Sequence, residues 1–229
     1  MMGAHDRFQD RADAGRQLAE ELVAYRNKPD VVVLGLPRGG VPVAFEVAQY
    51  LNAKLDLILV RKLGVPYQPE LAMGAIASGG ASYLDYEMIR ELGISREAVR
   101  EVISKETEEL HRREGAYWQD RRSLELGGKI VILVDDGLAT GASMLAAIRA
   151  VQSSNPKKVV VAVPVAALDP KRKIESSVDE FVCVISPEYF NAVGHWYDTF
   201  GQTSDDEVCS LLSEAAFGLS TIHDRNKFV

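Results

Sequence analysis

The chain has 229 residues, of which 47% are hydrophobic and 26% are charged, a balance that is typical of a globular protein with a sizeable core. Its formal net charge of −7 argues against nucleic acid as a partner, because phosphate contacts need a basic face. No apolar run approaches the roughly 20 residues that a membrane-spanning helix needs, so no membrane is expected. Two cysteines and no signal peptide indicate a cytoplasmic protein.

The first half of the chain alternates predicted helices with predicted strands. An amphipathic helix comes first, and Asn27-Lys28-Pro29 breaks it. Gly79-Gly80 divides the last two strands of this half, which indicates a hairpin. The expected elements are a helix over 10–26, strands over 31–36 and 55–60 with a helix over 41–51 between them, and hairpin strands over 71–78 and 81–84.

The second half begins with a long, highly charged helix that Ser95 caps. Its apolar stripe is thin, so we expect one side to be packed and the rest to be solvated or to contact a second copy. Ser204-Asp205-Asp206-Glu207 forms a capping box at the start of the last helix. The expected elements are helices over 95–122, 144–151 and 204–217, a short helix capped by Asp169, and strands over 130–134, 158–165 and 181–185.

Strands that alternate with helices predict an α/β fold built on a parallel sheet. Ligands bind at the carboxyl ends of the strands in such a sheet. Three polar clusters follow predicted strand ends, namely Arg38-Gly39-Gly40, Arg61-Lys62 and residues 135–143. We therefore expect these clusters to converge on one edge of the sheet.

The most informative segment runs from residue 130 to residue 143 and reads IVILVDDGLATGAS. A buried strand ends in two adjacent carboxylates, Asp135 and Asp136, and a small, hydroxyl-bearing turn leads into a helix. Gly141 allows the backbone to approach an anion closely, and the helix N-terminus offers N–H donors to it. Two carboxylates would repel a phosphate, so the ligand must also carry sugar hydroxyls, a metal ion or both at that point.

This segment resembles the phosphoribosyl pyrophosphate (PRPP) motif of the type I phosphoribosyltransferases, and the resemblance covers about residues 31–165. It implies that Asp135 and Asp136 hold the ribose 2- and 3-hydroxyls and, directly or indirectly, Mg²⁺. The residues that it implies for the 5-phosphate are Ala139, Thr140, Gly141, Ala142 and Ser143. A solvated Asp-Asp turn would explain the strand and the turn, but not a hydroxyl-bearing loop that leads straight into a helix.

Two further clusters fit the resemblance. Arg38, Gly39 and Gly40 open a helix at the position of the family's pyrophosphate loop, where an arginine fork and a helix N-terminus bind anions. Arg61 and Lys62 resemble the start of the catalytic loop in adenine-type enzymes and would stabilise the charge on departing pyrophosphate. The alternative is a solvated basic pair. The following residues depart from those enzymes, and the long charged helix has no counterpart there, so how the site closes stays open.

Two features concern the acceptor, the compound to which such an enzyme would transfer the ribose 5-phosphate group. Ala139 stands where hypoxanthine/guanine-type enzymes carry an Asp that helps to protonate the purine, so a 6-oxopurine is not expected. The aromatic segment over 189–200 follows a predicted strand end and should therefore start on the edge that holds the acidic pair. Phe190 or Trp196 would stack on a planar acceptor ring. Packing within a small lobe explains the same aromatic residues without a ligand.

The resemblance implies one phosphoribosyltransferase-like domain over 1–229, with a core over about 27–185, a helical insertion over about 85–125 and a hood over about 186–203 plus neighbouring segments. It implies an enzyme that transfers the ribose 5-phosphate group of PRPP to a nitrogenous acceptor, with Mg²⁺ and release of pyrophosphate. Two alternatives are a non-catalytic PRPP- or nucleotide-binding regulator and a hydrolase of a phosphoribosyl compound. The charged helix is also compatible with a homodimer contact.

Overall fold

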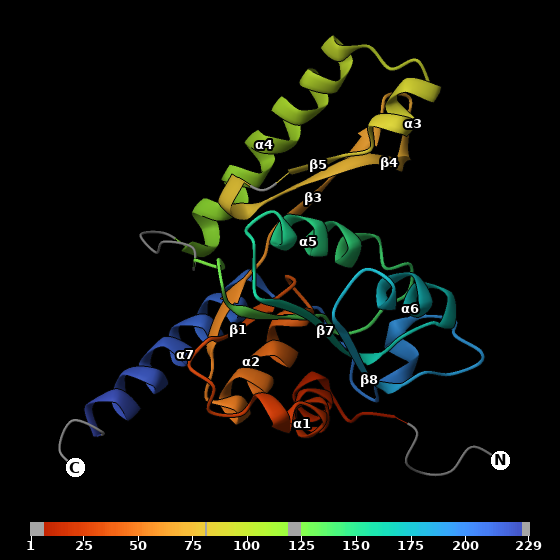
Figure 1. Ribbon diagram of the computed structural model, residues 1–229. Coiled ribbons are helices and arrows are strands. Elements are labelled where there is room, and N and C mark those ends of the chain that lie inside the picture. Colours follow the sequence, from red (N-terminus) through yellow and green to blue (C-terminus); the bar gives the residue numbers. More distant parts are fainter. Residues whose placement is uncertain (1–6, 81, 119–124, 226–229) are drawn as a thin grey trace.

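The computed structural model describes residues 7–80, 82–118 and 125–225 of the chain and is shown in Figure 1. Within these residues, five parallel strands form a central sheet in the order β2-β1-β6-β7-β8. The strands are β1 Val31–Gly35, β2 Lys54–Leu57, β6 Ile130–Val134, β7 Lys158–Val165 and β8 Glu180–Ile185. This architecture confirms the predicted α/β fold on a parallel sheet.

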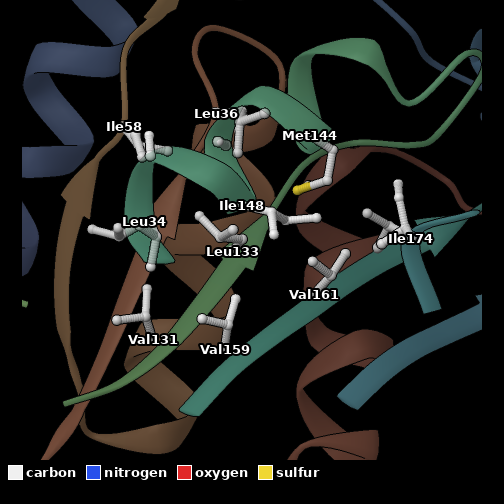
Figure 2. Packing of buried hydrophobic residues seen from close by; sticks show 14 of the residues in the cluster. Leu34, Leu36, Ile58, Val131, Leu133, Met144, Ile148, Val159, Val161 and Ile174 are labelled. Carbon is white, nitrogen blue, oxygen red and sulfur yellow. The ribbon is translucent and has the colours of Figure 1, made fainter. Parts of the chain in front are cut away.

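Helices cover both faces of the central sheet, which explains why its inner strands are apolar throughout. The covering helices are α1 Arg11–Glu21, α2 Gly40–Leu51, α5 Ala142–Gln152 and α6 Leu168–Glu175. Successive side chains of a strand point to opposite faces. Leu133 of β6 accordingly packs toward α5 and α6, while Ile132 packs toward α1 and α2. Figure 2 shows the first of these two faces, where Met144 and Ile174 of the helices lie over the strand residues.

A second, smaller sheet is antiparallel and has the order β3-β4-β5 in the described part of the chain. Its elements are β3 Val60–Val65, β4 Gln68–Ala77 and β5 Ser82–Leu84, followed by the helices α3 Tyr86–Glu91 and α4 Arg96–Trp118. Helix α5 lies between the two sheets and contacts both (Figure 1). Helix α4 packs on the small sheet through Val99 and Leu110, and the last helix, α7 Asp205–Arg225, joins this cluster through Val208.

The structure corrects the expectation for residues 55–85. The predicted strand over 55–60 is divided between β2 of the central sheet and β3 of the small sheet, so Arg61 and Lys62 lie inside β3. Ile58 and Leu59 remain apolar and buried across the change of sheet, so the hydrophobic pattern did not reveal the break. A short turn joins β3 to β4, and in it Tyr67 has a φ of 68°. Helix α3, only six residues long, was not predicted.

Most predicted helix starts are confirmed. The hydroxyls of Ser95 and Ser204 each accept a hydrogen bond of 3.1 Å from the backbone N–H three residues later. The prediction for α6 was wrong, because its cap residue is Ala167 and Asp169 lies in its first turn. Residues 119–122 of the predicted long helix lie outside the described residues. Among the helices that are described, none is both long enough and apolar enough to cross a membrane.

Candidate functional site

Two loops meet at the carboxyl edge of the central sheet. Strands β1 and β6 are neighbours in parallel register, so the loop that leads into α2 lies against the loop that leads into α5. A Cβ atom on Gly40 would lie 2.8 Å from Asp135 Cα, and one on Gly39 would overlap Asp136 Oδ2. Glycine alone permits this approach, because it has no Cβ atom. The two clusters that sequence reasoning singled out are therefore in direct contact.

Asp135 lies at the centre of this contact and is partly buried. Its Oδ1 accepts a hydrogen bond of 2.8 Å from the backbone N–H of Asp136. Burial, with a smaller contribution from the neighbouring Asp136 carboxylate, raises the pKa of Asp135 well above its ordinary value. Ionisation of both carboxylates is therefore unfavourable. A hydroxyl group that donates a hydrogen bond to the pair would reduce this cost.

Asp136 is paired with Arg11, the first residue of α1. Arg11 Nε and Nη2 lie 2.9 Å and 2.8 Å from Asp136 Oδ2, and Nη1 donates to the carbonyl oxygen of Gly201 at 2.7 Å. The guanidinium also lies 4.0 Å from the ring centroid of Phe200. Burial raises the pKa of Asp136, and the Arg11 charge opposes that rise. Both side chains are largely buried, so Arg11 fixes this carboxylate in place.

The aromatic segment after β8 lies beside the same pair. Tyr197 donates its hydroxyl to the carbonyl oxygen of Asp136 at 2.6 Å, and its ring packs against Phe8 and Phe200 at centroid distances of 5.4 Å and 5.0 Å. A Cβ atom on Gly137 would lie 2.7 Å from a methyl carbon of Val193, so this segment also covers the residue after the pair. Residues 8–11 and 193–201, which are far apart in the sequence, therefore cover one side of the acidic pair.

Phe190 and Trp196, the predicted acceptor-binding residues, lie in the same aromatic segment. Both are partly buried and pack against a cluster that contains Phe8 and Tyr197. The indole Nε1 of Trp196 is buried, and the described part of the chain offers it no hydrogen-bond partner. Their packing fits a lobe-forming role, and stacking on an acceptor remains a prediction.

The loop after the acidic pair has the geometry of an anion site. Gly141 has a φ of 71° and caps α5, a left-handed conformation that favours glycine. Ala139, Thr140, Ala142 and Ser143 are exposed. Among the described residues, no side chain caps α5 in the usual geometry, and only Thr140 Oγ1 lies near a first-turn N–H, at 3.5 Å from Ala142 N. The N–H groups of this turn can therefore serve a bound phosphate.

Arg61 and Lys62 lie inside β3, the first strand of the small sheet, and not in a loop at the edge of the central sheet. Arg61 Nε donates to Glu106 Oε2 of α4 at 2.8 Å, so its guanidinium joins β3 to the helix. Lys62 is exposed and points to the opposite face of the strand. The expectation that this pair follows a strand of the central sheet was wrong, because the chain changes sheets just before it.

A cavity of about 270 Å³ lies beside the first loop. Its lining residues are Pro37, Arg38, Leu59, Arg112, Arg113, Tyr117 and Asp205. Three of them are arginines, one from the loop and two from α4. Sequence reasoning missed Arg112 and Arg113, because a charged helix pattern does not reveal which charges face a cavity. It also missed Arg11, for which the sequence holds no local signal.

The carboxylates of the site limit how a metal ion could bind. Among the described residues, no group of three or more His, Cys, Asp or Glu side chains is placed to hold a metal. Asp135 and Asp136 provide two carboxylates, and Arg11 already engages one of them. Mg²⁺ commonly keeps several waters and uses one or two carboxylates with substrate phosphates, a ligand set that these residues fit.

The chain is similar to known proteins over most of its length. A family model described as "Phosphoribosyl transferase domain" matches residues 70–198. A Mycobacterium tuberculosis protein, named provisionally as a phosphoribosyl transferase, is 48% identical over 208 residues, which are 91% of this chain and 47% of that protein. The chain thus spans about half the length of the curated relatives it matches. The protein TT1426 from Thermus thermophilus is 41% identical in sequence to this chain. Its crystal structure superposes with a TM-score of 0.84, and the match covers 91% of this chain and 98% of that one.

Proposed function

Because the chain belongs to the phosphoribosyl transferase domain family, we propose that it transfers the ribose 5-phosphate group of PRPP to a nitrogenous acceptor and releases pyrophosphate. The observation that carries the proposal is the contact of Gly39 and Gly40 with Asp135 and Asp136. This contact joins a ribose-binding acidic pair to a pyrophosphate loop, as a ligand with phosphates at both ends of a ribose requires.

Each part of PRPP has a proposed place. The 5-phosphate lies on the loop over 139–143, where the exposed first turn of α5 supplies N–H donors. The ribose hydroxyls donate to the carboxylates of Asp135 and Asp136. The pyrophosphate lies on Arg38, Gly39 and Gly40 at the start of α2.

In the proposed reaction the bond between ribose C1 and the pyrophosphate oxygen breaks, and its electron pair leaves with pyrophosphate. The lone pair of the acceptor nitrogen forms the new bond to C1, and an acceptor N–H proton is released to solvent or base. The protein contributes position and charge, because C1 gains positive character near Asp135 and the leaving group gains negative charge near Arg38. Mg²⁺, bound mainly to the phosphates of PRPP, would supply further charge neutralisation.

The acceptor is proposed to be a nitrogenous compound other than a 6-oxopurine. Ala139 is exposed at the loop and cannot transfer a proton, so it cannot assist attack by a purine as an acidic residue would. Phe190 and Trp196 are the candidate stacking residues. If one of them stacks on the acceptor, its alanine variant raises the acceptor KM and leaves PRPP affinity nearly unchanged.

Residues 1–229 are proposed to act as one unit, with α3 and α4 inside the insertion over about 85–125 and the segment over 186–203 as part of a hood. The curated relatives are about twice as long. Any acceptor or partner should therefore be identified first with the 229-residue chain. Only then should it be sought for these longer relatives.

The test is a panel of nitrogenous bases and amines incubated with PRPP and Mg²⁺, with pyrophosphate release as the readout. Acceptor-dependent release supports the proposal, and efficient turnover of hypoxanthine or guanine contradicts the part that rests on Ala139. Release without any acceptor indicates a hydrolase, and PRPP binding without release by any acceptor indicates a regulator. No PRPP binding at millimolar concentration in calorimetry rejects the proposed function.

A further inference from the structure

The cavity beside the first loop gathers positive charge from two separate parts of the fold. Arg38 comes from the loop after β1, whereas Arg112 and Arg113 come from α4 of the insertion. Its volume of about 270 Å³ is several times the roughly 30 Å³ that one water occupies in the liquid, so a small polyanion has room there. Guanidinium groups bind phosphate oxygens through paired N–H donors, which makes this lining suited to phosphate.

A carboxylate already lies among these cationic groups. Asp205, the first residue of α7, lies 4.0 Å from Arg38 Nη1 and accepts a hydrogen bond from the Tyr117 hydroxyl. Its charge also acts on Arg112, whose pKa is raised chiefly by Glu109. Asp205 therefore offsets part of the positive charge of the cavity, and both Arg38 and Tyr117 lie next to its carboxylate.

The two arginines of α4 are held in place by one residue. Glu109 accepts hydrogen bonds of 2.7 Å and 2.9 Å from Arg112 and one of 2.9 Å from Arg113. These bonds lower the pKa of Glu109 to about 2, so it stays ionised at neutral pH. Each guanidinium has five N–H donors, and Glu109 uses only part of them. Both arginines can therefore remain bonded to Glu109 while they contact a ligand.

Arg61 adds an ion pair to the apolar packing that holds α4 on the small sheet. Its guanidinium binds Glu106, which precedes Glu109 by about one helical turn on α4. The ion pair therefore joins β3 to the part of α4 that carries the two arginines. Arg61 is thus better suited to position the helix than to contact a leaving group itself.

We propose that Arg112 and Arg113 of α4 bind the diphosphate group of PRPP together with Arg38, so that the insertion helix supplies cations to the leaving group. This inference rests on the proposed function for the identity of the ligand. Charge builds on the diphosphate as its bond to C1 breaks, so three guanidiniums stabilise the transition state more than the ground state. Arg61 acts as a positioning residue for this helix.

The experiment measures binding of three ligands by calorimetry with Mg²⁺, namely PRPP, ribose 5-phosphate and inorganic pyrophosphate. The variants are Arg112→Ala, Arg113→Ala and the double variant, and the matched control is Arg100→Ala, an exposed arginine of the same helix. A charge-assisted hydrogen bond corresponds to roughly 10-fold in affinity or more. We expect each cavity variant to weaken PRPP and pyrophosphate about 10-fold, with ribose 5-phosphate and the control unchanged.

Asp205→Asn tests the inference in the opposite direction. Asparagine can still accept the Tyr117 hydrogen bond but carries no charge, so pyrophosphate affinity should rise several-fold. The proposal is overturned if the double variant binds PRPP and pyrophosphate as the wild type does, or if it loses ribose 5-phosphate equally. If the wild type binds pyrophosphate, with loss in the double variant, but binds neither PRPP nor ribose 5-phosphate, the proposed function is rejected. The arginine-lined cavity would then still be an anion site.

Discussion

The two ends of the proposed site are built on different physical principles. At the acidic end, Asp136 is fixed by Arg11 and Tyr197, and glycine backbone lies directly against both carboxylates. At the basic end, Arg38 and Arg112 are long side chains that remain about half or more exposed. The first end is rigid because its groups are packed, whereas the second can adjust to a ligand.

This difference has energetic consequences. Removing a packed group leaves a partner without compensation, so substitutions at the acidic end should affect both folding and activity. Exposed charges are screened by salt within about 10 Å at 0.1 M ionic strength, so binding at the arginine-lined end should weaken as salt rises. Under the proposed function, the acidic end would orient the sugar, and the basic end would set the affinity for the leaving group.

The largest effect is expected when both carboxylates of the acidic pair are neutralised. Asp135→Asn with Asp136→Asn keeps the shape of both side chains but removes the charges proposed to hold the ribose. Loss of a preorganised electrostatic group costs about 100-fold or more in turnover. Pyrophosphate release measures the loss, and circular dichroism checks that the fold persists. Turnover at the wild-type rate would reject the role assigned to the pair.

Arg11→Ala tests whether the acidic end is rigid because of its ion pair. The substitution leaves the Asp136 carboxylate partly buried without its cation, and we expect unfolding free energy to fall by about 2 kcal/mol, less than for a fully buried pair. Urea denaturation measures the change. Arg11→Lys, which keeps the charge without the forked geometry, should lose less. Equal stability of the alanine variant and the wild type would show that the pair does not hold this end together.

Tyr197→Phe removes a single neutral contact from the same end. The hydroxyl bond to the Asp136 carbonyl is lost while the ring packing against Phe8 and Phe200 stays. We expect a loss of about 1 kcal/mol in unfolding free energy. Tyr189→Phe is the matched control, because that side chain is 83% exposed and should cost almost nothing. Equal losses in the two variants would contradict a specific role for the Tyr197 hydroxyl.

The central sheet and the loop over 135–143 were predictable because their signals are local. A continuous apolar run followed by Asp135 and Asp136 marks both a buried strand and its carboxyl end, where parallel sheets bind ligands. The approach of the two loops also followed from topology, since strand ends share one edge. These predictions need only the order of elements along the chain.

The basic end was not predictable in the same way. Arg61 was expected after a strand of the central sheet because nothing in residues 55–60 marks the change to the small sheet. Arg112 and Arg113 look like ordinary solvated residues in the sequence, and only the packing of α4 brings them to Arg38. Arg11 reaches Asp136 across 125 residues of chain, a contact that no spacing rule contains.

The smallest expected effect is a gain in stability when Asp135 alone becomes Asn. Burial and the Asp136 charge raise the pKa of Asp135 in the folded protein above its ordinary value of 3.8. A carboxyl group with a raised folded pKa contributes stability that is fully present below the unfolded pKa and is lost as pH rises through the folded pKa. At neutral pH the ionised side chain is therefore unfavourable, and Asn, which cannot ionise, avoids this cost.

We expect Asp135→Asn to raise the Tm by roughly 1 °C at neutral pH. Asn Oδ1 still accepts the hydrogen bond from the Asp136 N–H, so no bond is lost. The gain should shrink as pH falls and the wild-type carboxyl takes up its proton. Thermal unfolding followed by circular dichroism across this pH range measures the trend. Asp198→Asn, at an exposed carboxylate, should show neither the gain nor the trend. A Tm difference that is independent of pH would mean that packing, and not charge, distinguishes this end of the site from the arginine-lined end.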